Sequence, residues 1–237
     1  MKNILEIKNL SKKFGKKEVL KNVSFSVGEG EIYGFLGPNG AGKTTTMKNI
    51  LGFLKPSSGE IKIFGKNIFD EKSKNEIGFM PENTYLYKYL TGKEFLEFNG
   101  KFFGLDGQNL DKKVENLLKK LGLEQAGDKF LKDYSKGMLQ RIGLAQAIIN
   151  EPKLLFLDEP MSGLDPIGRK MVKDLIVELN KAGTTIFFNT HILADVESIC
   201  DKISIIHNGE IIVESKKVSD IKGHLEDFFI ESVNQKK

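Results

Sequence analysis

The nine residues "GPNGAGKTT", from Gly37 to Thr45, decide the fold class of this chain. Their spacing fits G-x-x-x-x-G-K-[ST], in which backbone N–H groups surround phosphates, lysine reaches the outer phosphates and the hydroxyl ligates Mg²⁺. The apolar stretch "EIYGFL" before the loop predicts a buried strand, and "KTTTMKNILGFL" predicts a helix ending near Gly52. Because the motif and both flanks agree, a chance glycine turn is a poor alternative. The stretch therefore predicts a nucleotide site between a strand and a helix.

We expect the whole of this loop to contact the nucleotide. Lys43 also counts as a catalytic residue because it reaches the outer phosphates, and Thr44 is expected to be a metal ligand. The loop consists of Gly37, Pro38, Asn39, Gly40, Ala41, Gly42, Lys43, Thr44 and Thr45.

Two further strand ends carry groups that suit phosphate chemistry. "LLFLDEP" is an apolar strand ending in Asp158, expected to face the metal beside the phosphates, and Glu159, which could act as general base on water. Alternatively, both carboxylates only cap the strand or begin a turn. His191 follows "TTIFFNT", where a neutral imidazole could bond the terminal phosphate or bridge the water and Glu159. A lone histidine is more often structural, as we expect for His207 and His224.

The pattern along the chain predicts an α/β fold with a mostly parallel sheet. "LEIKNL" and "VLKNVSFSV" alternate like half-exposed strands, "GEIKIFG" and "EIGFMPE" indicate further strands, and "KLLFLD" and "TTIFFN" flank a helix. A helical insert lies between "EIGFMPE" and "KLLFLD". It has Thr91 and Glu94 in capping-box spacing, and its segment "LDKKVENLLKKLG" is apolar on one face. "ISIIHNGEIIV" predicts a hairpin with Asn208 and Gly209 at its turn.

The composition is that of an ordinary globular protein. The chain has 237 residues, of which 40% are hydrophobic and 29% charged, enough for one large domain or two lobes. No apolar run reaches the roughly 18 residues of a membrane-spanning helix, so we expect a cytoplasmic location. The only cysteine, Cys200, indicates a buried thiol and no internal disulfide. The net charge of +4 comes from scattered lysines and argues only weakly for a nucleic-acid partner.

A second segment, "YSKGMLQR" at 134–141, forms a small, polar entry into an apolar helix. With the phosphate loop, "LLFLDE", "SGLD" and "TH", it completes an ordered set of five motifs. In that order the chain resembles the nucleotide-binding subunits of ABC transporters from about Leu5 to Val213. The resemblance implies a P-loop NTPase core with an antiparallel β-subdomain and a helical subdomain. One ATPase domain would span 1–237, with its core at 1–84 and 150–215, its helical part at 85–149 and a C-terminal helix or tail at 216–237.

The resemblance also implies roles for particular residues. Phe14 matches the aromatic position that stacks on adenine, although it would equally suit a core phenylalanine. Ser135 and Gly137 match the signature that binds the γ-phosphate, where a hydroxyl, exposed N–H groups and a helix N-terminus suit an anion. Asp165 lies in the loop that crosses the family's dimer interface, and it is also a plausible N-cap before Pro166.

Two departures from the family pattern are visible. Glu82 stands where the family usually has a glutamine that helps to ligate Mg²⁺; a glutamate can still ligate this cation, and the alternative is a solvent-facing turn residue. In the signature, Lys136 replaces the first glycine of the usual pattern, and Met138 replaces the residue next to the second glycine.

The resemblance implies an ATPase subunit that dimerises around ATP, as a homodimer or heterodimer, and drives a separate integral-membrane permease. The segments "YSKGM" and "HLEDFF" resemble those found in exporters of drugs, lipids or polysaccharides. The ATPase subunit would be a peripheral protein on the inner face of the cell membrane. The aromatic "YLYKYL", with Tyr85, Tyr87 and Tyr89, could form the groove for the permease or simply pack the helical lobe.

Two other classes fit less well. A small-molecule kinase or GTPase would leave the signature unexplained, and the guanine motif N-K-x-D is absent. A non-transport ABC ATPase acting on nucleic acid or ribosomes typically has two nucleotide domains or a large insert.

Overall fold

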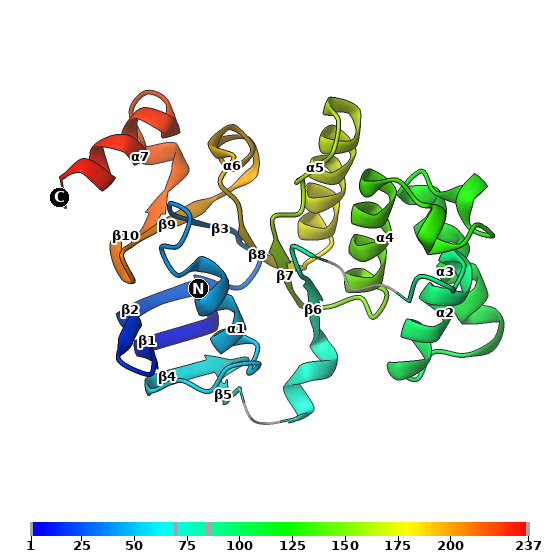
Figure 1. Cartoon of the computed structure of the whole chain (residues 1–237), viewed down its shortest axis with the longest axis horizontal. Helices are drawn as coiled ribbons and strands as arrows, with labels where there is room; N and C mark the ends of the chain where they lie inside the picture. The colour runs from blue at the N-terminus through cyan, green and yellow to red at the C-terminus, as the bar shows by residue number, and fades with distance from the viewer. Residues whose placement is uncertain (1, 69–70, 84–86, 236–237) are drawn as a thin grey trace. The chain divides into compact units, whose positions relative to one another are not determined.

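The chain divides into two compact units, residues 1–74 with 185–237 and residues 75–184. The computed structural model describes residues 2–68, 71–83 and 87–235 (Figure 1). The helical segment expected at 85–149 falls within the second unit, together with the strands and helix on either side of it.

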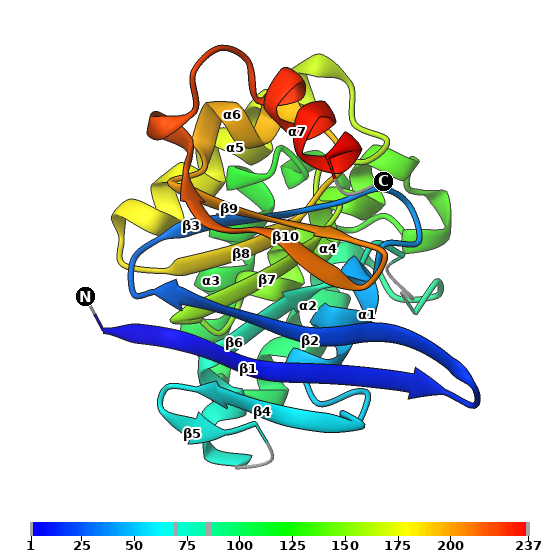
Figure 2. The same ribbon diagram turned by 90° about the vertical axis from the view of Figure 1, so that its left-hand side faces the viewer.

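The first unit begins with an antiparallel sheet whose strands run in the order β2-β1-β4-β5 (Figure 2). In β1 the apolar residues Leu5 and Ile7 are fully or almost fully buried, whereas Glu6 and Lys8 are not. This alternation is the one expected of strands with one buried face. The strands are β1 (Asn3–Phe14), β2 (Lys17–Gly28), β4 (Ser58–Ile63) and β5 (Lys66–Asn67).

The same unit contains a second group of strands in the order β10-β9-β3-β8. β3 pairs in parallel with β8 and with β9, and only β10 is antiparallel to its neighbour. β3 and β8 are buried along their whole length, which explains their continuous apolar sequences. The strands are β3 (Ile32–Leu36), β8 (Thr185–Asn189), β9 (Lys202–His207) and β10 (Glu210–Lys217).

Stacked aromatic rings fill the core of the first unit. The rings of Phe25, Tyr33 and Phe187 lie 5.8 to 5.9 Å apart between centroids, in nearly parallel planes. Burial raises the pKa of Tyr33 to about 12, so its hydroxyl stays protonated and lies 2.6 Å from Ser204 Oγ. Cys200 is buried, which confirms the prediction for the only cysteine, and this burial raises the pKa of its thiol.

The helices of the first unit follow its strands. α1 comes directly after the loop that follows β3, and α7 lies in the segment for which the sequence left a C-terminal helix or a tail open. The bounds are α1 (Lys43–Ile50), α6 (Leu193–Ile199), the 3-10 turn η4 (Val218–Asp220) and α7 (Leu225–Asn234). The hairpin prediction is also confirmed: β9 and β10 meet at Asn208 and Gly209, whose φ angles of 48° and 81° are those of a two-residue hairpin turn.

The described residues of the second unit contain two parallel strands and four α-helices. β6 (Ile77–Met80) is parallel to β7 (Leu154–Asp158). The helices are α2 (Gly92–Phe102), α3 (Gly107–Lys120), α4 (Lys136–Ile148) and α5 (Pro166–Lys181); 3-10 turns span η1 (Glu71–Glu76), at the boundary of the units, η2 (Glu124–Ala126) and η3 (Leu131–Asp133).

The predicted helix starts of this unit are confirmed. Thr91 and Glu94 form a reciprocal capping box at α2. At α5 the carboxylate of Asp165 accepts the N–H of Gly168 at 2.7 Å, with Pro166 in the first helical position. Burial of Val114, Leu117 and Leu118 confirms the apolar face of α3.

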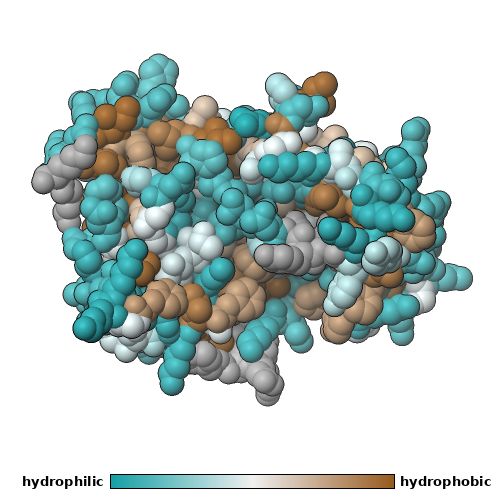
Figure 3. Space-filling view, in the orientation of Figure 1, coloured by the Kyte–Doolittle hydropathy of each residue, from teal (hydrophilic) through white to brown (hydrophobic). Residues whose placement is uncertain are grey.

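The face of the molecule shown in Figure 3 is mostly polar. Hydrophilic side chains cover most of the face shown in Figure 3, and apolar side chains gather there in small patches. Within the described residues, no helix is both long enough and apolar enough to span a bilayer.

Candidate functional site: a phosphate loop, two carboxylates and a second helix start

The phosphate loop has the backbone shape that its glycines permit. Gly42 has a φ of 115°, and a Cβ there would lie 2.7 Å from Leu20 Cδ2. A Cβ at Gly37 would lie 2.3 Å from the carbonyl oxygen of Ile206. A larger residue at either position would therefore collide with other atoms of the same chain. At Gly42 its backbone would also be strained by the positive φ. These contacts explain why the motif needs glycine at its ends.

Lys43 lies inside this loop and is only 9% exposed. Its ammonium group donates to the carbonyl oxygens of Gly37, at 2.6 Å, and of Pro38, at 3.2 Å. The lysine is therefore held over the loop, and the N-cap residue of α1 is Gly42, which makes no side-chain cap. A positive charge beside a helix N-terminus suits the phosphates of a nucleotide.

The turn between β9 and β10 supports the loop from outside. The N–H of Gly209 donates to the carbonyl oxygen of Ala41 at 3.0 Å, and the carbonyl oxygen of Gly209 accepts the N–H of Lys21 at 2.8 Å. This small turn thereby fixes the loop to β2. The sequence motif shows no sign of this support.

The paired carboxylates follow β7 in the second unit. Asp158 is the last residue of β7, and Glu159 follows it in a left-handed backbone conformation with a φ of 53°. Both are buried, at 4% and 8% exposure. Glu159 is thus held in a turn directly after a buried strand, where a carboxylate has a fixed direction.

The signature segment begins α4, as the sequence predicts. Ser135 is the N-cap, and its hydroxyl accepts the N–H of Met138 at 3.3 Å. Gly137 is half-buried, and a Cβ there would meet only Leu164 Cδ2, at 3.5 Å. The side chain of Lys136 lies against Gly163, where an added Cβ would lie 2.6 Å from its Cε. The signature and the segment containing Asp165 therefore touch.

The remaining predicted residues lie at the surface. Phe14 is 48% exposed, with Lys12 Nζ 5.0 Å from its ring centroid, so it is not a core phenylalanine. His191 and Glu82 are both exposed, each just beyond a strand end. Phe14 and His191 belong to the unit that contains the phosphate loop, and Glu82 belongs to the unit that contains Asp158.

Of the three tyrosines in "YLYKYL", Tyr87 is 62% exposed and Tyr89 is 81% exposed. Tyr85 lies outside the described residues. The Tyr87 ring meets the edge of Phe98 at 5.6 Å, and Phe98 meets Phe102 at 4.8 Å. These exposed aromatic residues favour a groove for a partner over simple packing of the helical part.

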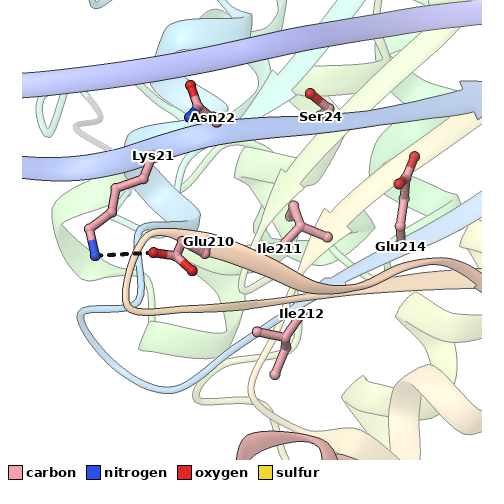
Figure 4. Close-up of a pocket in the computed structure, with 7 residues that line it drawn as sticks. All are labelled: Lys21, Asn22, Ser24, Glu210, Ile211, Ile212 and Glu214. Atoms are coloured by element: carbon pink, nitrogen blue, oxygen red, sulfur yellow. Dashed lines mark hydrogen bonds and ion pairs between the residues drawn. The ribbon is translucent and has the colours of Figure 1, made fainter. Parts of the chain in front are cut away.

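A cavity of about 420 Å³ between β2 and β10 contains none of the predicted site residues. In Figure 4, Lys21 points to Glu210, with 3.4 Å between Nζ and Oε1, and Glu214 lies farther along β10. Its two glutamates would repel a phosphate, so the phosphate loop remains the nucleotide-site candidate.

Sequence reasoning missed Gln140. The apolar pattern of α4 draws attention to Met138 and Leu139, yet these are only half-buried while Gln140 is 5% exposed. Its Nε2 donates to the carbonyl oxygen of Glu159 at 3.0 Å. A polar residue within an apolar helix was the only available signal.

Oxygen ligands suitable for Mg²⁺ are present among the predicted residues. The hydroxyl of Thr44 and the carboxylate of Asp158 are hard oxygen donors, and the glycines of the loop have the space and the backbone conformations of a phosphate-binding loop. A parallel sheet with such a loop between a strand and a helix defines the P-loop nucleotide-binding class.

Comparison with known proteins identifies the family. The sequence profile of the ABC transporter family matches residues 20–162. An ABC transporter ATP-binding protein of Synechocystis is 48% identical over 215 residues, which are 90% of this chain and 60% of that protein. The bacitracin transport ATP-binding protein BcrA of Bacillus licheniformis is 41% identical over 217 residues, or 90% of this chain and 70% of that protein.

A solved structure of an ATP-binding subunit of an ABC transporter gives a TM-score of 0.89 at 33% identity, covering 97% of this chain and 99% of that one. The chain therefore belongs to the ABC transporter ATP-binding family, and the fold class expected from its motifs is confirmed. It spans less than two thirds of the length of the Synechocystis relative.

Proposed function

We propose that the chain hydrolyses ATP and drives a separate membrane-spanning permease that exports its substrate. The observation that carries this proposal is the phosphate loop, which holds a buried lysine at the start of α1. The proposed domain is a single ATPase domain, with a nucleotide-binding core, a β-subdomain, the helical part at 85–149 and the C-terminal segment at 216–237.

The proposed roles follow from the chemistry of each side chain. Lys43 binds the outer phosphates, and Phe14 stacks on the adenine. Glu159 accepts the proton of the attacking water, and His191 orients that water or the terminal phosphate. The remaining nucleotide contacts come from the loop backbone and the hydroxyl of Thr45.

Thr44, Asp158 and Glu82 are the proposed ligands of Mg²⁺. When bound with ATP, the ion neutralises charge on the β- and γ-phosphates. Thr44 would contribute its hydroxyl oxygen and the two carboxylates their negative charge. The turn at Glu159 is held by two hydrogen bonds to its carbonyl oxygen, one from the side chain of Gln140 and one from the N–H of Ser162.

The second helix start is assigned to a different nucleotide. Ser135 and Gly137 would contact the γ-phosphate of ATP bound to a second ATPase subunit, and Asp165 would lie at the same interface. Two subunits, identical or related, would then pack head to tail around two ATP molecules. Hydrolysis removes the γ-phosphate contact and so shifts the population toward separated subunits.

The exposed rings of Tyr87 and Tyr89 support a permease contact in the second unit. Aromatic side chains are enriched at protein interfaces, where they bury large areas. Export is supported by the 41% identity to a bacitracin transport protein. Through its permease the subunit would lie on the inner face of the cell membrane. We propose no nucleic-acid partner, since the lysines are interspersed with acidic residues.

The test is to compare Glu159→Gln with the unchanged chain. ATP affinity should be retained while turnover falls roughly 10²-fold or more, because general-base help is lost. Steady-state phosphate release and equilibrium binding of a fluorescent ATP analogue measure the two quantities. Glu115→Gln, an exposed carboxylate on α3, is the matched control and should leave both unchanged. Normal turnover in Glu159→Gln would remove Glu159 from the role of base.

A further inference from the structure

Gln140 connects two parts of the second unit that the proposed reaction uses. It lies in the second turn of α4, the helix that begins at Ser135. Its side chain is 5% exposed, and its Nε2 donates to the carbonyl oxygen of Glu159 at 3.0 Å. A buried side-chain amide that donates a hydrogen bond to a backbone carbonyl oxygen is expected to fix the position of that peptide group.

The carbonyl that Gln140 holds belongs to a strained residue. Glu159 has a φ of 53°, a left-handed conformation that is unfavourable for a residue other than glycine. Such a conformation persists only where its surroundings hold it. The same carbonyl oxygen also accepts the N–H of Ser162 at 3.1 Å. Two donors, one from α4 and one from the following turn, therefore hold the backbone from which the carboxylate projects.

The rest of this network reaches the start of α4. Lys136 lies against Gly163, and Gly137 faces Leu164, so the first turn of α4 touches the turn that follows Glu159. Gln140 makes the hydrogen bond that ties this helix to Glu159 itself. A displacement of the helix start would consequently move the carboxylate.

We propose that Gln140 is a positioning residue that sets the direction of the Glu159 carboxylate and couples it to the helix that begins at Ser135. This inference rests on the proposed role of Glu159 as general base. Contact between Ser135 and a γ-phosphate would thus be transmitted to the base through one buried side chain. Small misplacements of a catalytic group lower rates strongly, so the contribution should be visible in turnover.

The experiment replaces the amide by a thioether of similar length, in Gln140→Met. Turnover under saturating ATP should fall about tenfold, the effect of losing one buried donor of roughly 1.4 kcal/mol, while the dissociation constant for ATP stays unchanged. Gln146→Met, on the same helix and half-buried, is the matched control and should keep full turnover. Circular dichroism checks that each variant is folded at the assay temperature. If Gln140→Met is not folded, Gln140→Leu takes its place.

A double-mutant cycle separates positioning from general loss of stability. In the Glu159→Gln background, Gln140→Met should cause no further loss of single-turnover hydrolysis, because there is no longer a base to position. Equal losses in both backgrounds, or full turnover in Gln140→Met, would overturn the inference while leaving Glu159 as base. Normal turnover in Glu159→Gln would instead overturn the proposed base, and the positioning role with it.

Discussion

Two helices of this protein begin at segments expected to bind phosphate, and they are built differently. α1 begins after Gly42, in a left-handed conformation and with no side-chain cap, whereas α4 begins with Ser135, whose hydroxyl accepts the N–H of Met138. The N-cap residue of α1 offers no side-chain acceptor, whereas the N-cap residue of α4 accepts one N–H of its own helix. At the start of α1 the backbone conformation of the glycines is enough to leave room for the phosphates of a nucleotide bound by the same chain.

The second helix start has a different requirement. The first N–H groups of α4 need acceptors. The hydroxyl of Ser135 supplies one to Met138 without adding charge, and its own O–H can still donate to a phosphate. This difference fits the proposal that α1 binds the chain's own nucleotide and α4 the nucleotide of a second subunit.

The strongest test of this comparison mixes two inactive chains. Lys43→Ala removes the ammonium group from the loop, and Gly137→Asp brings a carboxylate to the start of α4, where space exists for a Cβ. Each variant alone should show neither hydrolysis nor ATP-dependent pairing. In the mixture, one intact site forms from Lys43 of the second chain and Gly137 of the first, so pairing should reappear in size-exclusion chromatography.

If the signature acted within its own chain, no subunit in the mixture would have a complete site. Lack of recovery, with both variants folded and able to exchange partners, would contradict the assignment of α4 to a partner's nucleotide. Circular dichroism and subunit exchange between labelled chains provide these controls.

A smaller effect is expected from removing the cap of α4. Ser135→Ala should lower the free energy of unfolding by about 1 kcal/mol, and Thr91→Ala at α2 should do so by a similar amount, because each loses an N-cap. Only Ser135→Ala should also weaken ATP-dependent pairing, by about tenfold, since its hydroxyl is the proposed phosphate ligand. Urea denaturation and sedimentation in ATP measure the two effects. Equal pairing by both variants would make Ser135 a cap and nothing more.

The smallest effect is expected at Glu82. Glu82→Gln restores the residue usual in the family and should be tolerated, whereas Glu82→Ala should raise the Mg²⁺ concentration needed for half-maximal hydrolysis. Titrations of both variants against the unchanged chain, with Glu115→Ala as the control, measure this requirement. Three identical titrations would leave Glu82 as an exposed turn residue.

Features set by nearby residues could be predicted from the sequence. The phosphate loop, the Thr91 capping box, the Asp165 cap and the Asn208-Gly209 turn each depend on residues within a few positions of one another, and all are present. Burial of β3 and β8 likewise follows from their uninterrupted apolar sequences.

Features made by residues far apart in the chain could not be predicted. Nothing in the sequence shows that Gln140 meets Glu159, because the two are 19 residues apart and belong to a helix and a turn. The left-handed backbone of Glu159 is equally hidden, since that conformation is rare for a glutamate. Apart from the hairpin of β9 and β10, the sequence does not reveal which strands become neighbours in the sheets.

The turn at Gly209 has a consequence for how the protein is made. Its hydrogen bonds to Ala41 and Lys21, and the pairing of β3 with β8 and β9, join the glycine loop to segments synthesised about 150 residues or more later. During translation the glycine loop leaves the ribosome long before the strands that support it, and contacts between distant segments form slowly. The loop can therefore take its folded shape only after β9 and β10 have been made. A chain interrupted before β9 would contain the nucleotide motif without its folded shape.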